Sequence, residues 1–157
     1  MKSIIIYYSN SGTTEALAKR IQGIFGGELI SIVPRVPYGS YGAAIKRAGK
    51  ERKNKEVAEY DAQVCELTDI DIIFVGYPIW YSDAPEFVLD YLRKYDFAGK
   101  TLIPFATSGA SNIKGTLVRL HEAAKGAKLE HPFTQKKLGK GNFDKWIQEI
   151  KADNGAD

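Results

Sequence analysis

The chain has 157 residues, of which 44% are hydrophobic, 26% charged and 11% aromatic. This is ordinary globular usage, and it excludes disordered, collagen-like and fibrous proteins. The single cysteine, Cys65, excludes an intramolecular disulfide and a cysteine-rich zinc site, and it favours a reducing cytoplasm. The apolar run from Ile4 to Tyr8 is too short for a signal-peptide core or a bilayer-spanning helix. We therefore expect one cytoplasmic domain over residues 1–157, without a membrane partner.

The charge of the chain is unevenly distributed. The formal net charge is only +3, yet six basic and two acidic residues lie between Lys46 and Glu56. A nucleic-acid-binding protein usually carries a stronger basic excess, so no nucleic-acid partner is expected. Lys46, Lys50 and Lys53 would share one face of a helix, and we expect the apolar set of Tyr41, Ala44, Ile45 and Ala48 to face a sheet.

Strands and helices alternate along the chain. Strands are predicted at 2–8, 29–33, 70–76, 101–106 and 128–133. Helices are predicted between them and at the end from apolar residues at helical spacing, namely Leu17, Ile21, Ile24 and Phe25; the set at 41–48; Phe87, Val88, Tyr91, Leu92 and Tyr95; Ile113, Leu117 and Leu120; and Phe143, Trp146, Ile147 and Ile150. Asp83 and Pro85 have the residue types that start a helix.

This alternation predicts an α/β fold with a doubly wound parallel sheet that helices cover on both faces. The first strand has no polar alternation, as expected for a strand buried on both sides. Pro104 lies inside the fourth strand and lacks an N–H group, so we expect it near an edge or a bulge. Ligands of such sheets bind beyond the carboxyl ends of the strands, which directs attention to the loops there.

The first loop lies between a strand and a helix and consists of Ser9, Asn10, Ser11, Gly12, Thr13 and Thr14. Free N–H groups and the positive end of the helix dipole would make it a phosphate site. It lacks the lysine of an NTPase P-loop and the spaced glycines of a dinucleotide fingerprint. Alternatively, one of its hydroxyls merely caps the helix.

The second and third loops add an aromatic surface and polar groups. The second, residues 76–83, contains Tyr77, Trp80 and Tyr81, and exposed rings at this edge suit a flat aromatic ligand. Alternatively, Trp80 or Tyr81 covers an edge of the core. The third loop, residues 107–112, is small and hydroxylated and could bind the polar edge of a heterocycle or merely cap a helix.

A phosphate site, an aromatic surface and a polar edge together describe flavin mononucleotide (FMN). The segments YYSNSGTT, VGYPIWYSDAPEFVLDYL and DFAGKTLIPFATSGAS resemble the flavodoxin-like family of FMN-binding proteins over nearly the whole chain. The resemblance implies a five-stranded sheet in the order 2-1-3-4-5. It would place Ser9, Ser11, Gly12, Thr13 and Thr14 on the phosphate, Pro78, Ile79, Trp80 and Tyr81 along the isoalloxazine, and Thr107, Ser108 and Gly109 at its pyrimidine side. Asn10 and Ser111, in the same loops, are also candidates for FMN binding.

Other chemistry is not indicated. The acidic residues of a receiver domain are absent after the first and third strands, and no G-x-S-x-G elbow occurs. Cys65, His121 and His131 lie outside the three loops, so we expect structural or solvated roles for them. No side chain is nominated as an acid–base catalyst, and no metal is expected.

The expected function is therefore electron or hydride transfer by bound FMN. Two forms remain open: an NAD(P)H-dependent oxidoreductase with a quinone-type acceptor, and a flavodoxin-type carrier that meets a redox partner protein. A non-enzymatic module that holds FMN to regulate a partner is the alternative from another class. A monomer or weak dimer is expected.

Overall fold

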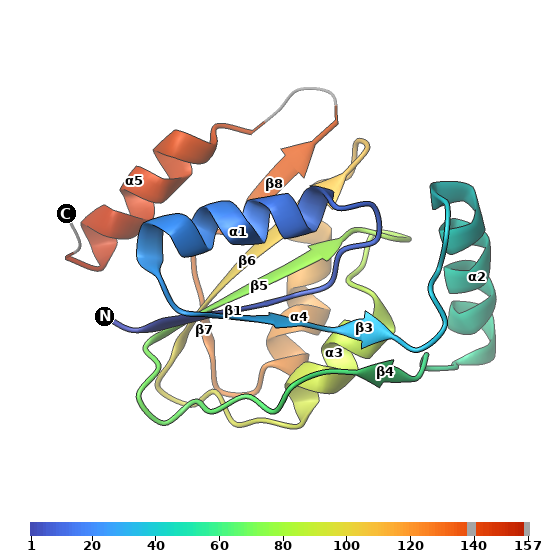
Figure 1. Ribbon diagram of the computed structural model, residues 1–157, viewed down its shortest axis with the longest axis horizontal. Helices are drawn as coiled ribbons and strands as arrows, with labels where there is room; N and C mark the ends of the chain where they lie inside the picture. Colours follow the sequence, from blue (N-terminus) through green and yellow to red (C-terminus); the bar gives the residue numbers. More distant parts are fainter. Residues whose placement is uncertain (138–140, 156–157) are drawn as a thin grey trace.

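The computed structural model describes residues 1–137 and 141–155. Its elements follow the alternation expected from the sequence (Figure 1). The strands are β1 (Ser3–Tyr7), β2 (Glu28–Ser31), β3 (Val33–Pro34), β4 (Tyr60–Asp61), β5 (Ile72–Pro78), β6 (Thr101–Ser108), β7 (Lys128–Leu129) and β8 (Phe133–Lys136). The helices are α1 (Thr13–Phe25), α2 (Tyr41–Asn54), α3 (Glu86–Arg93), α4 (Leu117–Ala123), α5 (Phe143–Asp153) and the 3-10 turn η1 (Ile113–Thr116).

A parallel sheet forms the centre, in the order β2-β1-β5-β6-β7, with β8 also paired to β6. This is the predicted order 2-1-3-4-5, with the fifth position shared by two short strands. All residues of β1 are buried, as its continuous apolarity predicted. The prediction missed a small antiparallel pair, β3 with β4, which extends beside the main sheet.

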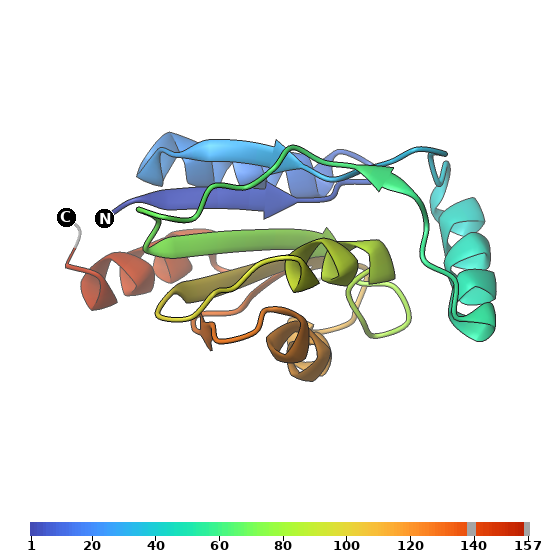
Figure 2. The same ribbon diagram turned by 90° about the horizontal axis from the view of Figure 1, so that it is seen from below.

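Helices cover both faces of the sheet, as expected. On one face, Leu17 and Ile21 of α1 and Trp146 of α5 pack with Phe74 in one hydrophobic cluster. On the other face, α3 and α4 pack in a second cluster that includes Phe87. The two layers of helices are visible on either side of the sheet in Figure 2. The sheet is thereby fixed, and its carboxyl-end loops are held on a rigid base.

Pro104 lies on β6 between the residues that pair with β7 and those that pair with β8. β7 pairs with β6 at Thr101 and Leu102, and β8 pairs from Phe105 onward, so Pro104 falls in the interruption between them. The proline nitrogen cannot donate a hydrogen bond, and here no strand on the outer side requires one. The expectation of an edge or bulge position is confirmed.

Helix α2 does not cover the sheet, contrary to our expectation. It stands beyond the carboxyl ends of the strands, at one end of the molecule (Figures 1 and 2). Tyr41 is 67% exposed, and only Ala44 of the helix is fully buried. The apolar residues of α2 are mostly small, so they cannot form a stripe broad enough to cover a sheet.

The ends of two other helices also differ from the predictions. Ile24 of α1 is 41% exposed, and Tyr95 lies beyond the end of α3. No helix within residues 1–137 and 141–155 is both long enough and apolar enough to cross a membrane. The same described part of the chain contains no cluster of three potential metal ligands.

Candidate functional site

The three loops singled out from the sequence meet at the carboxyl end of the sheet. The hydroxyls of Thr14 and Thr107 are hydrogen-bonded at 2.9 Å and buried, which joins the first loop to the third. The N–H group of Ile79 donates to the carbonyl of Thr107 at 2.9 Å, which joins the second loop to the third. Because β1, β5 and β6 are neighbours, their parallel pairing brings residues far apart in sequence to this one edge.

The start of α1 has no side-chain cap. Gly12 is the N-cap residue, with φ at 98°, a conformation that glycine adopts without strain. The hydroxyl of Ser9 accepts a hydrogen bond from the Gly12 N–H at 3.1 Å, which tightens the loop ahead of the helix. The capping alternative therefore does not hold here. The first N–H groups of the helix and its dipole remain available to an anion.

Two hydroxyls of the first loop are exposed at this helix start. Ser11 and Thr13 are exposed, and their hydroxyl oxygens lie 3.3 Å apart. Asn10 instead fixes the loop: its amide donates to the Gly39 carbonyl at 3.0 Å and its side-chain oxygen accepts from the Tyr8 hydroxyl at 3.0 Å. The loop thus presents neutral donors without a lysine, on a backbone that neighbouring segments hold in place.

The second loop turns sharply at Tyr81 and Ser82. The backbones of Trp80 and Asp83 exchange two hydrogen bonds of 3.1 Å across the turn. Both turn residues have positive φ, 53° for Tyr81 and 58° for Ser82. Residues other than glycine adopt a positive φ at a cost of about 1–3 kcal/mol each. The surrounding contacts must therefore hold the turn.

The rings of Trp80 and Tyr81 have different environments. Trp80 is 6% exposed and packs with ring centroids 5.6 Å from Tyr8 and 4.9 Å from Tyr38. It therefore occupies the core-edge position that the sequence left open as an alternative. Tyr81 is 45% exposed, so it is the ring that this loop presents at the surface.

Tyr81 also connects the second loop to α2. Its hydroxyl donates to the Ile45 carbonyl at 2.9 Å. Gly49 lies under the ring, and a Cβ atom added there would be 2.4 Å from the Tyr81 hydroxyl oxygen. The absence of a side chain at position 49 therefore allows the tyrosine to reach the helix backbone. Sequence reasoning missed this contact, because the glycine stands in an ordinary helical stretch.

We expect the free energy of unfolding, measured with denaturant, to be about 1 kcal/mol lower for Gly49→Ala than for Gly23→Ala. Alanine stabilises a helix interior by about 0.5–1 kcal/mol relative to glycine. A Cβ on Gly23 of α1 meets nothing within 4 Å, so it should give that gain. At Gly49 the displaced tyrosine loses a hydrogen bond, which offsets the gain. Equal stabilisation by both substitutions would show that Tyr81 does not pack on the helix.

Pro85 stands at the start of α3 as predicted, whereas Asp83 does not cap the helix. The helix begins at Glu86, Pro85 is the N-cap residue, and no side chain caps the helix. One carboxylate oxygen of Asp83 accepts from the Ala84 N–H at 3.1 Å, which tightens the loop locally. The other oxygen is engaged by arginines from elsewhere in the chain, which draws the side chain away from the helix start.

These arginines form an ionic network around the second loop. Arg119 of α4 contacts Asp83 at 2.8 Å and Glu86 at 2.7 Å, and Arg52 of α2 lies 3.6 Å from Asp83. Partial burial alone would raise the pKa of Glu86, but hydrogen bonds from Arg119 and Arg93 lower it below its ordinary value. The network ties the loop to two helices, and its partners are too distant in sequence to have been predicted.

The third loop contains one helix cap and several exposed groups. The Asn112 side chain accepts from the Lys114 N–H at 2.9 Å, so the capping alternative holds for this residue. The Ser108 hydroxyl donates to the Ser111 carbonyl at 2.5 Å, which closes the loop on itself. Gly109 and Ser111 are exposed at the same edge of the sheet.

A cavity of about 400 Å³ lies between α2 and the second loop. Its described lining combines the rings of Tyr38, Trp80 and Tyr81 with charged side chains that include Arg52 and Arg119. No residue of the first or third loop is among the described lining residues. The cavity therefore adjoins the three-loop site on the α2 side of Tyr81, and it depends on α2 standing away from the sheet.

The residues expected to have structural roles lie away from this site. Cys65 is 5% exposed and packs in the core. His121 is exposed, and His131 lies 2.6 Å from the Asp153 carboxylate near the end of α5. Burial chiefly raises the pKa of the Cys65 thiol from 9.0 to about 11, and Glu28 and Glu66 add to the effect.

We expect thiol labelling of the native chain to accelerate up to about pH 11, and that of the unfolded chain to level off near pH 9. The thiolate is the reactive form, and burial postpones its formation. Because the folded chain holds the thiol proton more tightly than the unfolded chain, protonated Cys65 contributes to stability. This contribution is complete below about pH 9 and should be lost as the pH rises to about 11. Rates with a small alkylating reagent at several pH values test this, and identical pH profiles would contradict it.

Comparison with known proteins supports the family expected from the motifs. The model of the family described as Flavodoxin matches residues 2–150. A candidate flavoprotein from Bacteroides uniformis is 28% identical, with 96% of this chain and 97% of that chain covered and a TM-score of 0.79. A candidate flavoprotein from Bacteroides eggerthii is 26% identical, with 96% of each chain covered and a TM-score of 0.78.

A third structure, more distant in sequence, shows the same fold. It is a flavoprotein from Lactobacillus acidophilus in complex with FMN, 24% identical, with 93% of this chain and 98% of that chain covered and a TM-score of 0.71. No curated protein matches the sequence. The family match extends over nearly the whole chain, and the sheet order is the one that the resemblance implied. The chain belongs to the flavodoxin family.

Proposed function

We propose that this member of the flavodoxin family binds FMN at its three loops and acts as an electron-transfer protein. The observation that carries the proposal is the uncapped start of α1, which opens at the point where the three loops meet. The complex of the Lactobacillus acidophilus flavoprotein with FMN supports the choice of cofactor.

The first loop suits the phosphate group of FMN. The N–H groups at the start of α1 and the exposed hydroxyls of Ser11 and Thr13 are the donors that a dianion requires. Gly12 gives the backbone its left-handed turn, while Ser9 and Asn10 hold the loop in shape. Neutral donors of this kind can hold a phosphate that is never transferred.

The second and third loops suit the flavin ring. Pro78, Ile79 and the exposed ring of Tyr81 would flank the isoalloxazine, with Trp80 packed behind the loop. Thr107, Ser108, Gly109 and Ser111 would bind the pyrimidine side through backbone and hydroxyl groups. When bound, FMN supplies one- or two-electron chemistry, and these side chains provide binding, orientation and electrostatics.

The experiment that tests this function loads the purified chain with FMN and follows the flavin absorption under anaerobic conditions. Electron transfer predicts that a reductant bleaches the bound flavin and that an added acceptor restores it. Sustained oxidation of NADH or NADPH with a quinone would identify an oxidoreductase. Exchange with a protein carrier alone would identify a flavodoxin-type carrier. FMN that stays bound without exchanging electrons would contradict the redox role and favour a regulatory module.

A further inference from the structure

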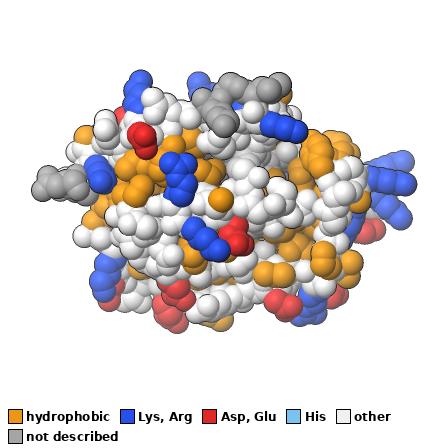
Figure 3. Space-filling model, turned by 45° about the horizontal axis from the view of Figure 1, so that its top comes forward, with side chains coloured by type: hydrophobic (Ala, Val, Ile, Leu, Met, Phe, Trp, Pro, Cys, Tyr) orange, Lys and Arg blue, Asp and Glu red, His pale blue; other side chains and the backbone are white. Residues whose placement is uncertain are grey.

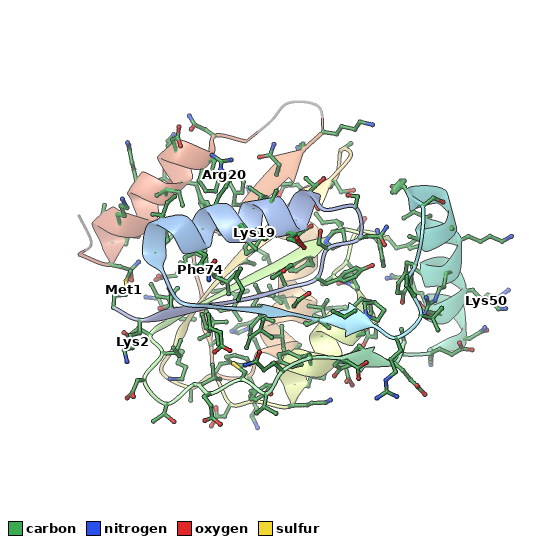
Figure 4. All side chains as sticks on the ribbon, in the orientation of Figure 1. Met1, Lys2, Lys19, Arg20, Lys50 and Phe74 are labelled. Atoms are coloured by element: carbon green, nitrogen blue, oxygen red, sulfur yellow. The ribbon has the colours of Figure 1, made fainter. Side chains whose placement is uncertain are left out.

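The outer face of α2 carries three lysines at helical spacing. Lys46, Lys50 and Lys53 are all exposed, and Lys50 points away from the body in Figure 4. The first and the last are seven positions apart, or about 10 Å along the helix axis. No ion pair within the described part of the chain involves any of the three. We call these three residues the lysine face.

Two acidic residues near the lysine face, Glu51 and Asp83, are engaged elsewhere. Glu51 is hydrogen-bonded to the Tyr38 hydroxyl at 2.5 Å and pairs with Arg47 at 3.3 Å on the inner side of the helix. Asp83 is held by arginines under the second loop. Glu56, beyond the end of the helix, is exposed. The positive charge of the outer face is therefore largely uncompensated.

The lysine face lies at the end of the molecule where the three loops open. The Tyr81 hydroxyl is bonded to the backbone of α2, so the helix and the second loop form one surface. Figure 3 shows basic and hydrophobic side chains gathered at this end.

We propose that the lysine face docks an acidic protein that exchanges electrons at the three-loop site. The partner's role rests on the proposed function, whereas the docking itself does not require FMN. The lysines stand on a convex helix and are spread over about 10 Å, so they cannot enclose one small anion.

A nucleic acid fits this surface less well. The formal net charge is +3, and the chain outside residues 46–56 is close to neutral. Non-specific nucleic-acid binding draws on many phosphate contacts, whereas this face offers three lysines. Docking to an acidic protein surface requires fewer charges, because complementarity mainly raises the association rate. The lysine face therefore matches a protein partner.

The test uses an acidic [2Fe–2S] ferredoxin as the probe and basic cytochrome c as its counterpart. Calorimetric titrations at low and high salt measure binding to the parent chain, with and without FMN. We compare K46E/K50E/K53E with K2E/K125E/K151E, a control with the same change in net charge. Lys2 and the end of α5 lie at the opposite end of the molecule from Lys50 (Figures 1 and 4).

Docking predicts that the parent binds ferredoxin more tightly than cytochrome c and loses affinity as salt increases. The lysine-face variant should bind ferredoxin at least about tenfold more weakly at low salt, and the control variant within about threefold of the parent. The affinity of the neutral variant K46Q/K50Q/K53Q for ferredoxin should lie between that of the parent and that of K46E/K50E/K53E. Circular dichroism checks that all variants are folded.

Three outcomes would overturn the proposal: no ferredoxin binding by the parent, an equal loss in the control variant, or tighter binding of a short DNA duplex at physiological salt. Binding is measured without electron transfer, so failure of the proposed function is visible separately. A chain that takes up no FMN but binds ferredoxin through the lysine face would contradict the flavin assignment and retain the docking surface.

Discussion

Riboflavin is expected to bind at least about a hundredfold more weakly than FMN. The two ligands share the ring and differ in the phosphate group, so the comparison isolates the first loop. Each hydrogen bond between a charged phosphate oxygen and an N–H or hydroxyl group contributes about 1.5–3 kcal/mol. The uncapped start of α1 and the hydroxyls of Ser11 and Thr13 offer several such donors. Losing two of them accounts for the expected ratio.

Titration of the chain with each ligand, followed by flavin fluorescence, measures this ratio. The double variant S11A/T13A should weaken FMN binding and leave riboflavin binding nearly unchanged. Thr68→Ala, an exposed threonine outside the three loops, is the matched control and should affect neither ligand. Equal affinity of the parent for riboflavin and FMN would rule out a phosphate site at this loop.

Trp80→Ala should lower the free energy of unfolding by about 3–5 kcal/mol, the range for removing a buried aromatic side chain. The Trp80 ring is 6% exposed and packs against Tyr8 and Tyr38, so its removal leaves a cavity at the edge of the core. FMN binding should weaken as well, because the second loop loses its support. Denaturant unfolding of the chain without FMN measures the stability effect alone.

Tyr81→Ala provides the contrast. Tyr81 is 45% exposed, and its removal should lower stability by only about 1 kcal/mol, through the lost hydrogen bond to α2. If this ring flanks the flavin, FMN binding should weaken by about 1 kcal/mol as well. A Trp80→Ala chain that is as stable as Tyr81→Ala would show that the Trp80 ring does not belong to the core.

The sheet was predictable because its strands are strongly patterned. Residues 3–7 and 72–78 are nearly all buried, and their continuous apolarity is what a parallel sheet between two helix layers requires. The loops of the site followed from the same pattern, because the strand ends locate the ligand-binding edge. The contact between the Thr14 and Thr107 hydroxyls is a direct consequence of the strand order.

The surroundings of the site were not predictable in the same way. The position of α2 depends on several tertiary contacts, among them those of Tyr81 with Gly49 and of Arg52 with Asp83, and the types of these residues do not predict them. Aspartate is a common N-cap residue, but the Asp83 carboxylate accepts a hydrogen bond from Arg119, 36 residues later in the chain, and does not cap the helix. Helix periodicity shows which residues share one face of a helix. Tertiary contacts decide which element that face packs against.

Amide NMR spectra of the isotope-labelled chain, recorded as FMN is added, test the central claim most directly. We predict saturation at one FMN per chain, with the largest shifts at residues 11–15 and 107–111 and in the second loop. The amides of α5, on the covered face of the sheet, should move little. Shifts concentrated outside the three loops, or no shifts at all, would contradict the assignment of this edge of the sheet as the FMN site.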